Sequence, residues 1–245
     1  MKTHKYQRRF YRDWVGAKDL YLTRIAVKET DLQILTDKPL DKNFIKEKIC
    51  LYRRQIENYI AKDHRFFASL KPIAVELNAP AIVKDMAKAA KKANVGPMAA
   101  VAGAIAGCLG KDLSRRGYKD IIIENGGDIF LKSKKIRQIR IYAGRSKLWN
   151  NLKLKIKPQD TPLGICTSSG TVGYSLSFGL TDATIILAKS PSLADAVATA
   201  TANRVKNKDD LKKGIDFAKS LKGVLGAVII IKNNIICWGK LNLIG

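Results

Sequence analysis

Histidine and paired cysteine are scarce in this chain. It contains two histidines, His4 and His64, and four cysteines, none of which forms a C-x-x-C pair. Imidazole and thiolate are the usual ligands of zinc, and a Ser-His-Asp triad needs a histidine beside its serine. The sequence therefore argues against a zinc centre, a disulfide-stapled scaffold and a conventional serine hydrolase. Any metal is expected to be held by oxygen atoms.

Long apolar runs are also missing. No stretch approaches the ~20 apolar residues that span a bilayer, and no apolar segment follows the basic residues 1–10. We therefore predict neither a membrane helix nor a signal peptide, and we expect a cytoplasmic protein without a membrane partner. The P-loop pattern G-x-x-x-x-G-K-[ST] and a G-x-G-x-x-G after a strand are absent too, which argues against both of these nucleotide-binding modes.

The remaining composition is that of a folded protein. The chain has 245 residues, of which 46% are hydrophobic and 27% charged, enough to bury a sizeable core. No repeat or low-complexity linker interrupts it, so we predict a single domain over 1–245. Predicted strands cluster at the start, the middle and the end with helix pairs between them, which indicates an α+β class.

Several local signals place individual elements. Asp41 is expected to cap a helix that runs to Lys62, and the residues His64–Pro72 are expected to leave that helix as a loop. Pro80 is expected to start a helix that ends near Asn94. Pro97 begins a further helix, whose small residues allow close packing or the approach of a ligand.

Positive charge is the strongest feature that is present. The formal net charge is +24, and residues 132–157 hold ten Lys or Arg and no acidic residue. Two strands with a basic face are predicted there. They could hold a polyphosphate or a nucleic-acid backbone, could be an edge hairpin that lysines protect from aggregation, or could belong to a generally lysine-rich surface. No recognition helix accompanies the charge, so sequence-specific nucleic-acid binding is not expected.

An acidic glycine turn follows a predicted buried strand. Its residues are Glu124, Asn125, Gly126, Gly127 and Asp128. Asn-Gly usually joins antiparallel strands, so a plain hairpin explains part of the pattern. The two glycines would also let backbone N–H groups approach a phosphate or a flavin-type ring.

The stretch 164–205 organises the chain. A small-residue loop that contains Thr167, Ser168, Ser169 and Gly170 precedes a predicted apolar strand, Ala183–Ala188. Pro191 then opens a helix, which Ser190 can cap. Asp195 and Thr199 lie four residues apart on one face of that helix, where two hard oxygens form a half-site for a small divalent cation. A purely structural role for both residues explains the same spacing.

Three motifs together resemble the ApbE-like superfamily. The segment Ile122–Ile129 resembles its glycine-aspartate turn, Thr167–Gly170 its Thr-Ser-Gly loop, and Leu193–Ala200 its Ala-Asp-x-x-Ala-Thr helix. The resemblance covers about 95–205, whereas the N-terminal third (1–94) is divergent. A small, functionally uncharacterised branch of the superfamily is the most similar, since it shares the Gly96–Ala100 segment and the loop Ser175–Gly179.

The resemblance implies a fold and an activity. The fold would be α+β, with antiparallel β-sheets and helices packed on one side. Known members are magnesium-dependent flavin transferases that split FAD and attach FMN to a protein. It implies that Asp195 and Thr199 bind Mg²⁺, that the turn Asn125–Asp128 lines a site for FAD or FMN, and that Thr167, Ser168 and Gly170 lie near the reacting phosphates. Glu124 and Ser169, which adjoin these two segments, are also predicted to bind the cofactor. We further predict that Asp128 and Asp182 act as proton acceptors.

Two functions remain open at this point. The first is an enzyme that acts on the FAD pyrophosphate with Mg²⁺, with a dinucleotide or other phosphate-bearing ligand as substrate and a protein as a candidate acceptor. The second is a non-enzymatic module that binds a cofactor or nucleic acid through its basic surface. The interval 173–182 lacks the histidine and the Asp-Pro-x-Thr-Gly pattern of the transferases, a departure that bears on the transfer step more than on binding. A homo-oligomer is compatible with either function.

Overall fold

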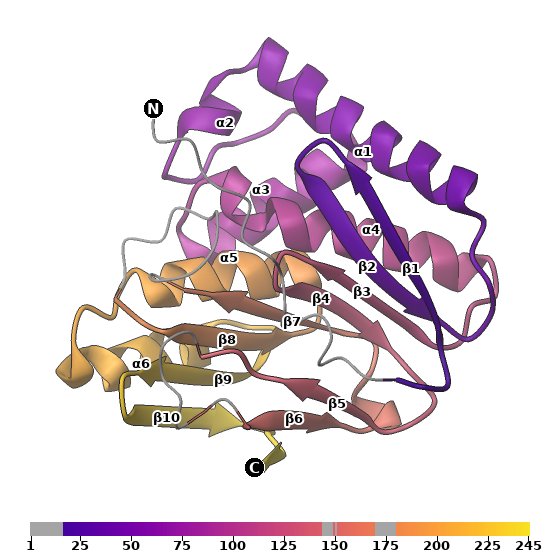
Figure 1. The fold of residues 1–245 in the computed structure, drawn as a ribbon. Coiled ribbons are helices and arrows are strands. Elements are labelled where there is room, and N and C mark those ends of the chain that lie inside the picture. Colours follow the sequence, from indigo (N-terminus) through magenta and orange to yellow (C-terminus); the bar gives the residue numbers. More distant parts are fainter. Residues whose placement is uncertain (1–16, 144–148, 150, 170–179) are drawn as a thin grey trace.

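An eight-stranded antiparallel sheet forms the centre of the protein (Figure 1). The computed structural model describes residues 17–143, 149, 151–169 and 180–245. The strands lie in the order β1-β2-β3-β4-β7-β8-β9-β10, and each is antiparallel to its neighbour. Their bounds are β1 Tyr21–Val27, β2 Thr30–Thr36, β3 Ile121–Asn125, β4 Asp128–Lys132, β7 Leu163–Ser168, β8 Ala183–Ala188, β9 Val224–Ile231 and β10 Asn234–Gly239.

A second, smaller sheet covers one face of the large sheet. Its order is β11-β6-β5, with β5 Arg137–Arg140, β6 Lys153–Ile156 and β11 Leu243–Ile244. Ile139 and Leu154 point inward and join a buried cluster with Ile122, Ile165 and other residues of the large sheet. This core between the two sheets follows from strand alternation, since every second residue faces it.

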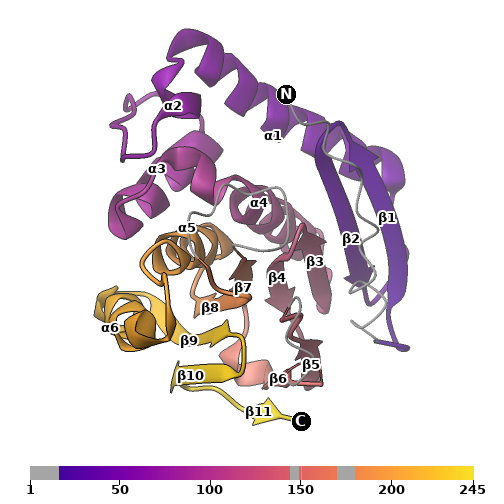
Figure 2. The same cartoon turned by 60° about the vertical axis from the view of Figure 1, so that its left-hand side comes forward.

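Helices cover the opposite face (Figures 1 and 2). Ile123 and Phe130 of the large sheet belong to the helix-side core, which also holds Leu109 and Val197. The α+β class with antiparallel sheets and helices on one side is thereby confirmed. The helices are α1 Lys42–Lys62, α2 Arg65–Ala68, α3 Ala81–Ala93, η2 Pro97–Ala100, α4 Val101–Arg115, η4 Pro158–Asp160, α5 Pro191–Ala202, η5 Lys208–Asp210 and α6 Leu211–Ser220.

Local capping signals explain several helix boundaries. The side chain of Asp41 accepts hydrogen bonds from the N–H groups of Asn43 and Phe44 and so starts α1. Ser190 accepts from the N–H of Leu193 and starts α5, while Asn94 ends α3 in a left-handed conformation. These caps satisfy backbone groups that a helix end leaves unpaired.

One local prediction is wrong. The segment expected to be a loop after α1 contains the single helical turn α2, in which Phe66 is fully buried. Phe66 packs edge-on against Tyr59, with 5.1 Å between ring centroids. This tertiary contact fixes a turn that the local sequence does not signal.

The described helices agree with the absence of a predicted membrane helix. Within the described residues, no single helix is long and apolar enough to cross a bilayer. Only α3 combined with Pro97–Arg115 has the length and composition, and these two segments meet at a bend of 103°.

Candidate functional site

The start of α4 lies directly against the start of α5. A Cβ atom on Gly103 would lie 2.4 Å from the carbonyl oxygen of Pro191 and 2.9 Å from the Cβ of Asp195. Gly164 of β7 touches the same proline from the sheet side, where a Cβ would lie 2.4 Å from its Cα. Such distances permit only glycine. The first turn of α5 is therefore held between α4 and β7, and this packing fixes the position of Asp195.

Asp195 joins the two helices through a hydrogen bond. Its Oδ2 accepts from the backbone N–H of Gly103 at 2.9 Å. Burial raises the pKa of Asp195 to about 7, although hydrogen bonds from the backbone of Gly103 and Ala102 act in the opposite direction. The side chain thus caps the N-terminus of α4, so Asp195 has a structural role toward a helix other than its own.

Asp128 lies close to Asp195 and is also buried. The pKa of Asp128 is raised well above its usual value by burial and next by the charge of Asp195. Cys166 stands directly opposite Asp128 in the sheet register, and its thiol donates to the carbonyl oxygen of Pro191 at 3.3 Å. Two carboxyl groups at short range in a desolvated place favour a state in which one carries a proton.

The glycine turn is a tight hairpin that is tied to α4. Gly126 and Gly127 connect β3 and β4 with φ values of 67° and 103°, a conformation that favours glycine. The N–H of Gly127 donates to Oε1 of Glu124 at 2.8 Å. The amide of Asn125 donates to the carbonyl oxygen of Ala102 at 3.1 Å, which brings the turn to the start of α4.

Strand alternation divides the predicted residues between the two faces of the sheet. Asn125 and Asp128 share the helix-side face with Phe130, whereas Glu124 shares its face with Ile122, on the side of the small sheet. In β7, Cys166 and Ser168 face the helices and Thr167 faces the other way. The site on the helix side is thus built from Asn125, Asp128, Ser168 and Asp195, and the side chains of Glu124 and Thr167 lie outside it.

Ser168 adds a polar atom to this face. Ser168 is 4% exposed, and its hydroxyl has no hydrogen-bond partner in the part of the chain that the structure describes. A buried hydroxyl without a partner is uncommon and needs an explanation, for which an absent ligand is one candidate. Ser169 adjoins it, and Gly170 lies outside the described residues.

Asp182 is engaged elsewhere. Its Oδ2 accepts from the backbone N–H of Lys232 at 2.6 Å, and its own N–H donates to the carbonyl oxygen of Ile230. It therefore anchors the turn between β9 and β10. Among the described residues, no hydrogen bond or ion pair joins it to Asp128, so the structure does not unite the two predicted proton acceptors.

The donor set fits a hard cation in part. Asp195 and Thr199 lie one helical turn apart in α5, and Thr199 is buried. Across the described residues, no group of three or more His, Cys, Asp or Glu is arranged to hold a metal. Mg²⁺ tolerates such a sparse protein shell when waters and phosphate oxygens complete it. The residues thus fit a magnesium ion that arrives together with a phosphate-bearing ligand.

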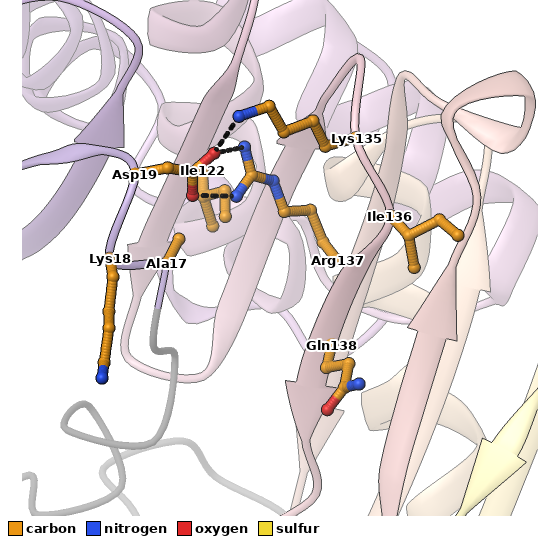
Figure 3. A pocket seen from close by; sticks show the side chains of 8 residues that line it. All are labelled: Ala17, Lys18, Asp19, Ile122, Lys135, Ile136, Arg137 and Gln138. Carbon is orange, nitrogen blue, oxygen red and sulfur yellow. Dashed lines mark hydrogen bonds and ion pairs between the residues drawn. The ribbon is translucent and has the colours of Figure 1, made fainter.

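A cavity among the described residues lies on the other side of the sheet. It measures about 570 Å³ and is bounded by Asp19, Ile122 and Arg137 among others (Figure 3). Its one carboxylate is already engaged, because Asp19 pairs with Arg137 at 2.7 Å and with Lys135 at 2.8 Å. We therefore assign the candidate site to the carboxylate pair and not to this cavity.

Sequence reasoning missed two members of the site. Cys166 directly precedes the predicted Thr-Ser-Gly loop, and alternation along β7 would have placed it on the same face as Ser168. Gly103 carried a weaker signal, since it was one of several small residues in α4. What makes it specific is the contact with Asp195, which is 92 residues away.

The fold and this site define a class of protein. The flavin transferase ApbE from Vibrio cholerae superposes with a TM-score of 0.59 at 14% identity, covering 89% of this chain and 97% of that one. The apo flavinyl transferase ApbE from Pseudomonas stutzeri gives a TM-score of 0.60 at 14% identity, covering 90% and 94%. These likenesses show that the chain has the ApbE fold.

Sequence comparison then gives the family. The model described as "AbpE bacteria" matches residues 12–234, so the chain belongs to this ApbE-like family. It is 42% identical over 226 residues to the UPF0280 protein MJ1526 of Methanocaldococcus jannaschii, covering 89% of this chain and 90% of that protein. A UPF0280 protein of Methanocella arvoryzae is 41% identical over 219 residues, covering 89% and 88%. The predicted membership of an uncharacterised ApbE-like branch is confirmed.

Proposed function

We propose that this protein binds a flavin dinucleotide at the helix-side site and acts on its pyrophosphate as a magnesium-dependent transferase or hydrolase. The observation that carries the proposal is the buried pair Asp128 and Asp195, which lies beside the glycine turn and the start of α4. The shared fold of ApbE flavin transferases supports the flavin as ligand. A protein acceptor would be the target if the reaction is a transfer.

Each residue has a distinct role in this proposal. Asp195 and Thr199 would hold Mg²⁺, which when bound neutralises charge on the phosphates. The main chain at Gly126 and Gly127 allows close approach of the ligand, since a Cβ on Gly126 would meet no atom within 4 Å. Ser168 offers its unpaired hydroxyl to the ligand.

Asp128 is the group that we assign to proton transfer. Burial and the charge of the neighbouring Asp195 raise its pKa, which makes its carboxylate a stronger base than an ordinary one. It would take the proton of an attacking hydroxyl and return it later. Asp182, which we predicted for the same role, is anchored to Lys232, so we place it second.

Calorimetric titration tests the binding step. FAD is titrated into the protein with Mg²⁺ and with EDTA, and we expect much tighter binding with the metal. Equal FAD affinity under both conditions would contradict the proposed site. The released products then identify the reaction, since cleavage of the pyrophosphate gives AMP and FMN, which chromatography separates.

A flavin carrier is the second candidate. The interval 173–182 lacks the histidine and the Asp-Pro-x-Thr-Gly pattern of the transferases, which favours binding without transfer. Tight, magnesium-dependent FAD binding with no AMP released over a long incubation would support the carrier. FMN attached to another protein would support the transferase.

A further inference from the structure

Three lysines form a straight row on the outer face of the small sheet. Lys153 and Lys155 lie in β6, and Lys157 follows in an extended conformation with φ −88° and ψ 152°. Leu154 and Ile156 point inward to the core between the sheets, so the lysines at every second position point outward. The Cα atoms of neighbouring lysines are therefore about 7 Å apart along one line.

The adjacent strand adds a further cation to the row. In the register of β5 and β6, Arg140 stands directly opposite Lys153 and Gln138 opposite Lys155. Like charges at directly opposed positions destabilise a sheet. None of β5, β6 and β11 contains an Asp or Glu, and the ion pairs of the described residues do not include the three lysines.

Protection of a sheet edge does not explain this row. Lysines guard edge strands, which expose unpaired backbone groups. Strand β6 is the middle strand of the small sheet, because Leu243 and Ile244 of β11 pair with it on one side and β5 pairs on the other. The edge-hairpin explanation considered from the sequence is therefore wrong for the lysine-bearing strand.

A general excess of lysine explains it only in part. Of the 45 Lys and Arg residues, ten lie in 132–157, whereas all 21 acidic residues lie outside that segment. A lysine-rich surface of the ordinary kind mixes both signs, as α1 does with its pair of Arg53 and Glu57 at 2.9 Å. The described strands of the small sheet contain no acidic residue that would provide such mixing.

The chemistry of this face fits a regular polyanion. Its outward positions in β5 and β6, namely Gln138, Arg140, Lys153 and Lys155, are polar or charged. Protein interfaces draw most of their energy from buried aromatic and apolar anchors, which these positions do not supply. A nucleic-acid backbone carries closely and evenly spaced charge along a line, as the row does.

We infer that the outer face of β5 and β6, with Lys153, Lys155, Lys157 and Arg140, binds the phosphate backbone of nucleic acid without reading its sequence. The small sheet and the helices cover opposite faces of the large sheet (Figure 2), so this surface is separate from the carboxylate site. The inference does not depend on the proposed function. It can hold or fail independently of flavin binding.

The test is the salt dependence of binding to short random-sequence duplex DNA. The triple variant Lys153→Gln, Lys155→Gln, Lys157→Gln is compared with wild type by fluorescence anisotropy. If each lysine neutralises a phosphate, the slope of log affinity against log salt becomes shallower by about 2.7. We expect at least about a tenfold loss of affinity at low salt.

A matched variant controls for net charge. Lys88→Gln, Lys91→Gln, Lys92→Gln removes three exposed charges from α3, on the helix side, and should leave the slope nearly unchanged. Equal effects of the two triples would overturn the inference, because attraction would then follow total charge. Unfolding midpoints of both variants confirm that each is folded.

Other polyanions decide the class of partner. Poly-glutamate and vesicles that contain phosphatidylserine are tested at the same salt concentrations. Weaker binding of both than of DNA supports the inference. The inference would be overturned if the triple variant Lys153→Gln, Lys155→Gln, Lys157→Gln lost more affinity for poly-glutamate or for the vesicles than for DNA. The partner would then be an acidic protein or a membrane surface, respectively.

Discussion

The carboxylate of Asp195 accepts a hydrogen bond from the backbone N–H of Gly103 at 2.9 Å and so links the helix that carries it to the N-terminus of another. Asp195, which we propose as a metal ligand, therefore also has a structural role. The two roles are separable because they use different properties of the side chain. The hydrogen bond needs an acceptor oxygen, whereas a cation needs a negative charge.

Two substitutions of Asp195 separate these roles. Asp195→Asn keeps an acceptor and removes the charge, so we expect loss of metal-dependent FAD binding with little change in stability at pH 5. Asp195→Ala also removes the cap, which costs about 1 kcal/mol. Calorimetry with FAD and Mg²⁺, together with urea unfolding, distinguishes them. Normal metal-dependent binding by Asp195→Asn would leave Asp195 with the structural role alone.

The glycine contacts between α4 and α5 give a second prediction. In Gly103→Ala the new methyl group would lie 2.4 Å from the Pro191 carbonyl oxygen, and we expect a loss of about 1–3 kcal/mol from overpacking. Gly107→Ala is the matched control on the same helix, since its nearest atom, Cδ of Pro191, is 3.4 Å away. Alanine there should be neutral or gain up to about 1 kcal/mol in helix propensity.

Urea unfolding of both variants measures the difference. A destabilisation of the same size at both glycines would show that helix packing here tolerates no added carbon at all. A neutral Gly103→Ala would show that Pro191 and Asp195 can move apart, and the position of Asp195 would then not depend on this contact.

Elements with local signals were predictable from the sequence. The hairpin at Gly126 and Gly127, the cap by Asp41 and the start of α5 at Pro191 each depend on a few adjacent residues. Turn and capping preferences act over such distances. The motifs also predicted that the glycine turn and Asp195 would belong together, and the contact of Asn125 with α4 brings them to the same region.

Relationships between distant segments could not be predicted in this way. Nothing near Lys153 shows that Ile244 will pair with it and make β6 a middle strand. Nothing near Asp182 shows that the N–H of Lys232, fifty residues later, will engage it. These outcomes depend on strand order, which tertiary packing sets.

A buried ion pair formed by Arg137, which also lines the cavity of Figure 3, gives a third prediction. The Arg137 and Asp120 side chains are 7% and 10% exposed and lie 3.0 Å apart. Arg137→Ala would leave Asp120 buried without its counter-charge, which costs about 3–5 kcal/mol. The substitution Asp19→Ala should cost at most about 1 kcal/mol, because the Asp19 side chain is 37% exposed. Thermal or urea unfolding of the two variants gives the comparison, and equal losses would contradict this ranking.

The glycine turn gives a fourth prediction. Gly126 has a φ of 67°, which asparagine tolerates better than other residues with a side chain. We expect Gly126→Asn to fold normally and to bind FAD more weakly, because its side chain enters space that the ligand would use. Circular dichroism and FAD titration check the two expectations. Unchanged affinity in the folded variant would show that the turn is only a hairpin.

The last prediction concerns pH. The pKa of Asp195 is raised from 3.8 to about 7 by burial, and that of Asp128 is raised in the same direction. The folded protein therefore binds more protons than the unfolded chain between about pH 4 and 7, so stability must fall as pH rises through this window. Asp19 does not change the slope of stability in this window. Hydrogen bonds from Arg137 and Lys135 lower its pKa, so its contribution to the free energy of unfolding is lost only in more acidic solution.

We thus expect the metal-free protein, in EDTA, to melt at a higher temperature at pH 5 than at pH 8. Asp195→Asn should flatten much of this difference, since it removes one of the two titrating groups. Mg²⁺ with a pyrophosphate ligand should raise the melting temperature more at pH 8, where the carboxylates are ionised and able to bind the cation. A wild-type protein that is more stable at pH 8 than at pH 5 in EDTA would contradict the raised pKa values, and with them the proton-sharing pair on which the proposed chemistry depends.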